Sequence, residues 1–242
     1  MNIVMIGNND PAGMMIAFAN AINRYSKHKA RVIAQEVRYN CNFEHDLTLP
    51  FLNDLQKEEI PEVIAQADIV HFHMAIDETD SIDRYKISDY MNNNQKILHH
   101  HHGEPPFRSD PKQFSDRYKK LGRKAIVATP DLLKLMPEAT WQPNLVPLNT
   151  ISLIPRFEHL KNSEKIIIAH SPTCKDLKNT DEFLNVTREL KQDYPQIETD
   201  IIELVSWLEV LHRKRNASII FDHMQGYFGI SSLEALALGL PT

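Results

Sequence analysis

Cysteine is scarce in this sequence, with only Cys41 and Cys174 among 242 residues. The two stand far apart and in no metal-ligand spacing, which suits a reducing compartment. No stretch approaches the roughly 20 consecutive apolar residues that cross a bilayer. The N-terminal Met-Asn-Ile-Val-Met-Ile-Gly segment lacks the basic residues that open a signal peptide. We therefore expect a cytoplasmic protein.

Long basic runs are also missing. The 27 Lys and Arg residues are scattered among 32 Asp and Glu residues, so the net charge is -5 and the pI is near 6.2. Proteins that bind nucleic acid usually gather positive charge on one face or along one helix. We therefore expect no nucleic-acid partner.

Hydrophobic residues make up 42% of the chain and charged residues 24%, enough for one large core or two modest ones. Short runs rich in Val and Ile alternate with longer amphipathic segments, which predicts an α/β protein with parallel sheets covered on both faces. The expected strands are Ile3–Ile6, Ala30–Ala34, Asp68–His73, Ile97–His102, Ala125–Ala128, Ile166–His170, Ile197–Glu203 and Ser218–Asp222. The expected helices are Met14–Tyr25, Asp54–Ala67, Thr180–Leu190, Ser206–Arg215 and Leu233–Leu238.

A domain boundary is expected near residues 150–164. Pro147, Pro155 and a polar run at residues 158–164 separate one strand–helix series from the next. We therefore predict two Rossmann-like domains, 1–150 and 165–242, with ligands at the carboxyl ends of their strands. Only three strands are expected after the boundary, whereas such sheets commonly have about 5–6, so the second domain is predicted to be incomplete.

The most informative segment is the last one, Gly226-Tyr-Phe-Gly-Ile-Ser-Ser-Leu-Glu-Ala-Leu-Ala-Leu-Gly-Leu-Pro-Thr242. Its first glycines permit the tight turn and close approach that an anion-binding loop needs. Ser231 and Glu234 have the spacing of a capping box, and Gly239 with Pro241 is a typical helix stop. The segment therefore predicts a glycine turn that leads into a helix facing a phosphorylated ligand.

This pattern, G-x-x-G-x-x-x-L-E-A-x-A-x-G-x-P, resembles the donor-site signature of family 4-type glycosyltransferases (glycosyl transferases group 1), which have the GT-B fold. The resemblance implies two Rossmann-like domains, with the acceptor held mainly by the first and the nucleotide-sugar donor mainly by the second. In the family another strand and several helices follow the signature, so the resemblance also implies a truncated C-terminal domain.

The loop after Ile166–His170 resembles the first strand and loop of the family's donor domain. Its segment Lys178-Asn-Thr-Asp181 is similar to the family's K-G-T-D. The resemblance places Ser171, Thr173 and Lys178 against the diphosphate, where a fixed ammonium stabilises the charge that develops on the leaving group. Many family members carry an Arg in this loop, and Ser171-Pro172-Thr173 stands in its place.

Glu234 matches the second acid of the family's E-x7-E signature, which bonds the nucleotide ribose. The resemblance also places the backbone of Gly229, Ser231 and Ser232 against ribose and phosphate. The first acid of the signature falls on Gly226 and is missing, and Asp222 or Gln225 is a candidate replacement. The capping box offers a purely structural role for the same Glu234 carboxylate.

In the first domain, the turn from Gly7 to Gly13 could present backbone amides to a ligand, and Gly13 is similar to the small residues of the first GT-B loop. The structural alternative is an ordinary turn, with Asp10 as the N-cap and Pro11 at the first helical position.

The run His99–His102 suggests a metal site, but four consecutive histidines on a strand split into two opposed pairs. Neither a cysteine nor a close acidic cluster completes a zinc-like shell, so we expect no metal. The resemblance instead places His102, which precedes Gly103, at the catalytic cleft; packing or capping is the alternative. His71 and His73 share a face of their strand, where core packing and ligand contact both remain open.

The resemblance implies a glycosyltransferase that moves a sugar from a nucleotide diphosphate sugar to a glycan or lipid-linked acceptor, as in polysaccharide biosynthesis. The expected mechanism is retaining and needs neither metal nor cofactor beyond the donor substrate. His102, Lys178 and Glu234 are the expected catalytic residues. A lipid-linked acceptor would allow peripheral association with a membrane. The alternatives are another GT-B enzyme, such as a nucleotide-sugar epimerase, and an inactive truncated or binding fragment.

Overall fold

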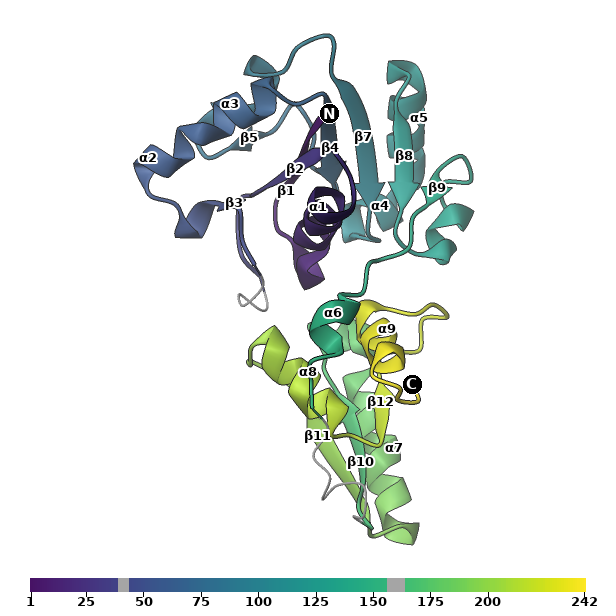
Figure 1. Cartoon of the computed structure of the whole chain (residues 1–242). Coiled ribbons are helices and arrows are strands. Elements are labelled where there is room, and N and C mark those ends of the chain that lie inside the picture. The colour runs from purple at the N-terminus through teal and green to yellow at the C-terminus, as the bar shows by residue number, and fades with distance from the viewer. Residues whose placement is uncertain (39–43, 156–163) are drawn as a thin grey trace. The chain divides into compact units, whose positions relative to one another are not determined.

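A computed structural model describes residues 1–38, 44–155 and 164–242, which fold as two compact units (Figure 1). The first unit contains residues 1–38 and 44–145, and the second contains residues 146–155 and 164–242. Residues 146–155 belong with the second unit because Val146, Ile151 and Ile154 pack in its core. The second unit therefore begins earlier in the chain than the expected residue 165.

The first unit is built on a seven-stranded sheet in the order β3-β2-β1-β4-β7-β8-β9, and every neighbouring pair is parallel. A separate antiparallel pair joins β5 to β6. The strands are β1 (Asn2–Gly7), β2 (Lys29–Ala34), β3 (Leu47–Thr48), β4 (Ile69–His73), β5 (Ser81–Ile82), β6 (Tyr85–Lys86), β7 (Lys96–His101), β8 (Lys124–Val127) and β9 (Thr140–Trp141).

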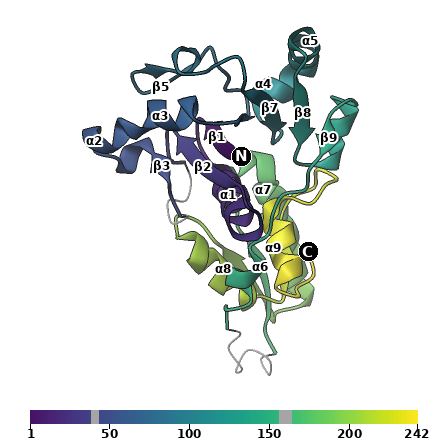
Figure 2. The ribbon, with the colours of Figure 1, turned by 45° about the horizontal axis from the view of Figure 1, so that its top comes forward.

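Side-chain alternation along the strands supplies apolar residues to both faces of this sheet. On one face, Met5 and Val32 pack against α1 (Met14–Tyr25), which contributes Met15 and Ala19; Figure 2 shows α1 lying along β1 and β2. On the other face, Val4, Ile6 and Phe72 pack with residues of α3 (Glu59–Ala65). The sheet is thus buried on both sides, as the Val- and Ile-rich strands predict.

The expected helix Asp54–Ala67 is broken into α2 (Asp54–Lys57) and α3. Asn53 caps α2 in a capping box with Gln56. Pro61 explains the break, because a proline has no N–H to donate to the carbonyl four residues earlier, at Lys57. Among the described residues, the other α-helices of this unit are α4 (Pro105–Ser109) and α5 (Pro111–Leu121).

The second unit has a three-stranded parallel sheet in the order β11-β10-β12. Its core on one face joins Ala169 and Ile220 of the sheet to Leu211 and Ala235 of two helices. The other face places the Phe221 ring parallel to Phe183, with centroids 5.0 Å apart. Its elements are α6 (Leu148–Ile151), β10 (Ile166–His170), α7 (Thr180–Asp193), β11 (Ile197–Ile201), α8 (Trp207–Arg215), β12 (Ile219–Phe221) and α9 (Ile230–Ala237).

Beyond α9 the chain turns back beside β12, where the Ile220 amide donates a hydrogen bond of 3.0 Å to the Pro241 carbonyl. Whether the second domain is truncated stays a prediction. None of the helices in the described ranges is long and apolar enough to cross a membrane.

Candidate functional site

The second sheet has a topological switch point between β10 and β12. From β10 the chain passes through α7 to β11 on one side, and later returns to β12 on the other. In open α/β sheets, ligands bind outside the carboxyl ends of the strands at such a point. Ser171 follows the end of β10, and Asp222 follows the end of β12. Ser171 and Asp222 therefore lie where open α/β sheets place ligands.

An ion pair joins the loop after β10 to the end of β12. Lys178 Nζ lies 2.5 Å from Asp222 Oδ1, and the side chains are 21% and 4% exposed. Burial alone would raise the pKa of Asp222, but the Lys178 charge and hydrogen bond outweigh it and hold this pKa below its ordinary value. The Asp222 carboxyl group is therefore ionised at neutral pH.

The second oxygen of Asp222 faces the start of α9. Oδ2 accepts hydrogen bonds from the Ser232 amide at 3.3 Å and the Ser232 hydroxyl at 2.8 Å. Gly229 is the N-cap of this helix, and a Cβ atom there would lie 2.6 Å from Oδ2 and 3.3 Å from Lys178 Nζ. Only glycine therefore fits at position 229 without displacing the ion pair.

The hydroxyls of Ser171 and Ser231 lie 3.1 Å apart, which connects the end of β10 to the first turn of α9. The structure thus brings together five of the expected donor residues around Asp222. Thr173, which was expected with them, lies on an exposed bend. We call this group the β10–β12 edge, defined by Ser171, Lys178, Asp222, Gly229, Ser231 and Ser232.

Glu234 does not close a capping box, and that part of the expectation is wrong. Its Oε1 accepts a hydrogen bond of 2.7 Å from Trp207 Nε1, and its Oε2 accepts one of 2.6 Å from Lys214 Nζ. The physical reason is the burial of Lys214, whose ammonium needs a counter-charge inside the protein. A ribose contact by Glu234 stays a prediction, and both of its oxygens already accept hydrogen bonds.

In the first unit, Gly13 adopts a left-handed conformation with φ of 65° and is the N-cap of α1. The Asp10 carboxylate accepts hydrogen bonds from the amides of Met15 and Ile16 at 2.8 and 3.0 Å. Asp10 therefore satisfies the first turn of α1, and it is also the N-cap position of a short 3-10 helix, Pro11–Gly13, that has Pro11 as its first residue and precedes α1. The amides of Met15 and Ile16 therefore donate to a side chain of the protein and not to a ligand.

His102 directly follows β7 and is half-buried. Its amide donates to Glu104 Oε2 at 3.0 Å, and its Nε2 lies 3.0 Å from His73 Nδ1. Burial lowers the pKa of His102 to about 4, against a smaller opposing influence of Glu104. The imidazole is therefore neutral near pH 7 and can serve as a hydrogen-bond partner.

The histidines of β7 divide between the two faces of the sheet, as a strand period of two requires. On one face His99 stacks on Tyr118 and His101 stacks on Phe107, each with ring centroids 4.0 Å apart. On the other face His100 stands beside His73 of β4, its register partner.

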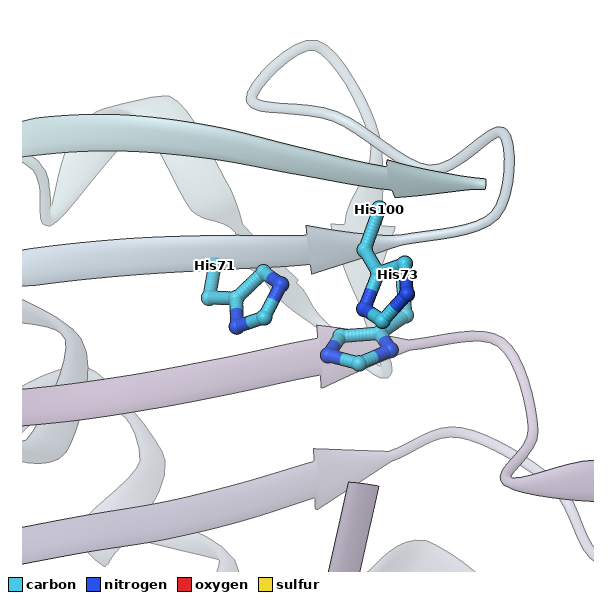
Figure 3. Close-up of side chains that lie close together, drawn as sticks. All are labelled: His71, His73 and His100. Atoms are coloured by element: carbon cyan, nitrogen blue, oxygen red, sulfur yellow. The ribbon is translucent and has the colours of Figure 1, made fainter. Parts of the chain in front are cut away.

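His71 of β4 completes a group of three with His73 and His100 (Figure 3). The expected absence of a metal stays a prediction, and it rests on the run His99–His102 and the lack of a nearby cysteine or acidic cluster, without His71 and His73 of the neighbouring strand. Two His-x-His patterns at the ends of two strands, residues 71–73 and 100–102, are the signal that could have indicated the group.

No family model matches the chain, and no curated protein matches it. Several solved structures do. An α-glucosyltransferase in complex with UDP-glucose and DNA containing an abasic site has a TM-score of 0.64 at 9% identity, over 98% of this chain and 78% of that chain. An α-glucosyltransferase in complex with UDP and DNA containing a HMU base has a TM-score of 0.63, with the same identity and coverage.

The UDP-GlcNAc 2-epimerase of Methanocaldococcus jannaschii has a TM-score of 0.53 at 13% identity, over all of this chain and 82% of its own. At such identities the likeness shows the fold, and the expected α/β fold of GT-B type is confirmed. Membership in family 4 stays a prediction. The expectation of no nucleic-acid partner is wrong, because the two glucosyltransferases of this fold are in complex with DNA. A net charge summed over the whole chain does not exclude such a partner.

Proposed function

We propose that the protein is a glycosyltransferase that uses a nucleotide diphosphate sugar, with the donor diphosphate held at the β10–β12 edge. One observation carries the proposal: the Lys178 ammonium, oriented by Asp222, stands at the carboxyl ends of β10 and β12 beside the N-terminus of α9. A fixed cation, helix-start amides and a switch point of the sheet together match the needs of a diphosphate.

The chemistry of donor cleavage explains why this arrangement suits transfer. Breaking the bond between sugar and phosphate leaves negative charge on the diphosphate, and a preorganised cation stabilises that charge where it develops. The Asp222 carboxylate accepts hydrogen bonds from both Lys178 and Ser232. It is therefore an anion bound at the position that we propose for the diphosphate. The diphosphate would share or displace these interactions, and Ser171 and Ser231 would add hydroxyl donors at the same edge.

Further assignments belong to this proposal. His102, neutral near pH 7, would hydrogen-bond the transferring sugar, and Gly13 would allow close approach at the start of α1. Thr173 is exposed and would contact the donor phosphate. Glu234 would act through its bonds to Trp207 and Lys214, which fix α9, as well as through the predicted ribose contact.

The acceptor is a glycan or lipid-linked sugar under this proposal, and transfer retains the configuration at the sugar without a metal at the donor site. DNA is a second candidate acceptor, which the two glucosyltransferase structures of the same fold favour. An epimerase is the alternative enzyme, supported by the lower-scoring match to the UDP-GlcNAc 2-epimerase.

Product analysis tests the proposal. The full chain is incubated with UDP-glucose and UDP-GlcNAc, each with a glycan, a lipid-linked sugar or duplex DNA, and the products are followed by NMR. A transferase forms free UDP together with a new glycoside, whereas an epimerase forms an isomerised donor. Formation of the isomer alone, or of no product from any pair, would contradict the proposal.

A pair of lysine variants links the activity to the site. Lys178→Gln keeps a hydrogen-bond donor near Asp222 but removes the charge, so turnover should fall. Lys175→Ala is the matched control, because Lys175 is exposed and pairs with Glu203 at 3.0 Å, away from Asp222. Equal turnover in wild type and Lys178→Gln would show that Lys178 has no role in the donor site.

A further inference from the structure

Three buried imidazoles of the first unit converge on one point without the hydrogen bonds that buried polar groups normally have. His71, His73 and His100 are 6%, 1% and 0% exposed. Among the described residues, no partner is present for Nε2 of His71, for Nε2 of His73, or for either ring nitrogen of His100. An unsatisfied buried group is costly, so several in one place point to a missing partner.

The geometry fits a single ion. One ring nitrogen from each histidine can be chosen so that all three lie within 4.8 Å of one another (Figure 3). Tetrahedral zinc sites have Zn–N bonds of about 2.0–2.1 Å, which places neighbouring ligand nitrogens roughly 3.4 Å apart. The limit of 4.8 Å exceeds this spacing by about 1.4 Å, which rotation of the imidazole rings would have to supply.

The backbone holds the three ligands in register. His73 and His100 are direct partners in the parallel pairing of β4 with β7, and His71 precedes His73 by two residues on the same face. The ring planes of His71 and His100 are almost parallel, with centroids 5.4 Å apart. Because all three side chains come from central strands, the site needs no loop movement to assemble.

A fourth histidine, His102, determines which ring nitrogen of His73 is available to bind a metal ion. His73 Nδ1 lies 3.0 Å from His102 Nε2, so Nδ1 is engaged and Nε2 remains for a ligand. Metal-bound histidines usually hydrogen-bond through their other nitrogen, which sets the tautomer and the ring orientation.

We propose that His71, His73 and His100 bind one divalent transition-metal ion, Zn²⁺, Ni²⁺ or Cu²⁺, which ties β4 to β7. Imidazole nitrogen suits these ions, whereas Mg²⁺ and Ca²⁺ require oxygen ligands. Three protein ligands leave a fourth position for water, as in zinc sites with an open coordination position. The three proposed ligands belong to the first unit, whereas the residues of the β10–β12 edge belong to the second.

The test uses Zn²⁺ and the full chain, with zinc affinity measured by competition against a chromophoric chelator. Wild type should bind one equivalent, and His100→Asn should weaken binding about 100-fold or more, since loss of even an outer-shell partner costs 10–100-fold. His99→Asn is the matched control: His99 is also buried on β7 but stacks on Tyr118 on the opposite face. It should bind like wild type.

Equal zinc affinity in wild type and His100→Asn, or no stoichiometric binding by wild type, would overturn the proposal. If His100→Asn does not fold, zinc-edge X-ray absorption of the wild-type adduct decides. Three imidazole nitrogens at about 2.0–2.1 Å support the site. A shell of oxygens, or of fewer than three imidazoles, would show that zinc binds elsewhere on the surface.

Discussion

Lys214 Nζ lies 2.6 Å from Glu234 Oε2, and the two side chains are only 1% and 5% exposed. The pair connects α8 to α9 beneath the β10–β12 edge, and Trp207 donates to the other Glu234 oxygen at 2.7 Å. Each charge is tolerated in the interior because the other is present. The pair therefore fixes the helix whose N-terminus faces Asp222.

Removing one partner should be costly. Lys214→Met leaves the Glu234 carboxylate buried without its counter-charge, and we expect the second unit to lose about 3–5 kcal/mol of stability. The double variant with Glu234→Leu should recover much of the loss. Urea unfolding followed by Trp207 fluorescence, in a Trp141→Phe background, measures the change.

An exposed ion pair provides the control for this comparison. Lys175 and Glu203 are 3.0 Å apart with side chains 57% and 32% exposed, so Lys175→Ala should cost only about 0–1 kcal/mol. A loss for Lys214→Met as small as this one would contradict the role assigned to the buried pair.

Asp10 should make the first unit less stable as the pH rises. Burial raises the pKa of Asp10 to about 6 from 3.8, despite the opposing backbone hydrogen bonds at the start of α1. The folded state therefore holds the proton more tightly than the unfolded state, and stability is lost as the pH rises from about 4 through 6. The contribution is about 3 kcal/mol at most.

The Asp10→Asn variant isolates this effect. Its free energy of unfolding should increase relative to that of wild type by about 2–3 kcal/mol between pH 4 and pH 7, measured by chemical denaturation. Asp54→Asn is the control, since the Asp54 side chain is 89% exposed. A constant difference between Asp10→Asn and wild type across this range would show that Asp10 titrates normally.

Local signals in the sequence predict much of the fold. The helix Met14–Tyr25 and the strand Ile166–His170 are observed with the expected bounds, because apolar periodicity and start signals lie within each segment. The two-residue strands β3 and β9 were missed, since so short a segment carries no periodicity. The helix α5 was also missed, because its sequence is largely polar.

The site residues show the limit of local reasoning. Lys178 and the serines of α9 were expected at the donor site from their motifs, but the partner of Lys178 is 44 residues away, at Asp222. Glu234 was assigned to a capping box because Ser231 is near in sequence, whereas its bonds go to α8. The histidine group likewise depends on the pairing of β4 with β7, for which the His-x-His patterns at the ends of both strands are the one local signal.

The most direct test of the central claim is calorimetric titration of UDP into the full chain, compared among wild type, Lys178→Gln and Lys175→Ala. If the Lys178 ammonium faces the diphosphate, the Lys178→Gln variant should lose about 1.5–3 kcal/mol of binding free energy, the range for a charged hydrogen bond. This corresponds to roughly 10- to 150-fold weaker affinity. Lys175→Ala should bind UDP as wild type does. Equal affinity for UDP in wild type and a folded Lys178→Gln variant would contradict the assignment of the donor site.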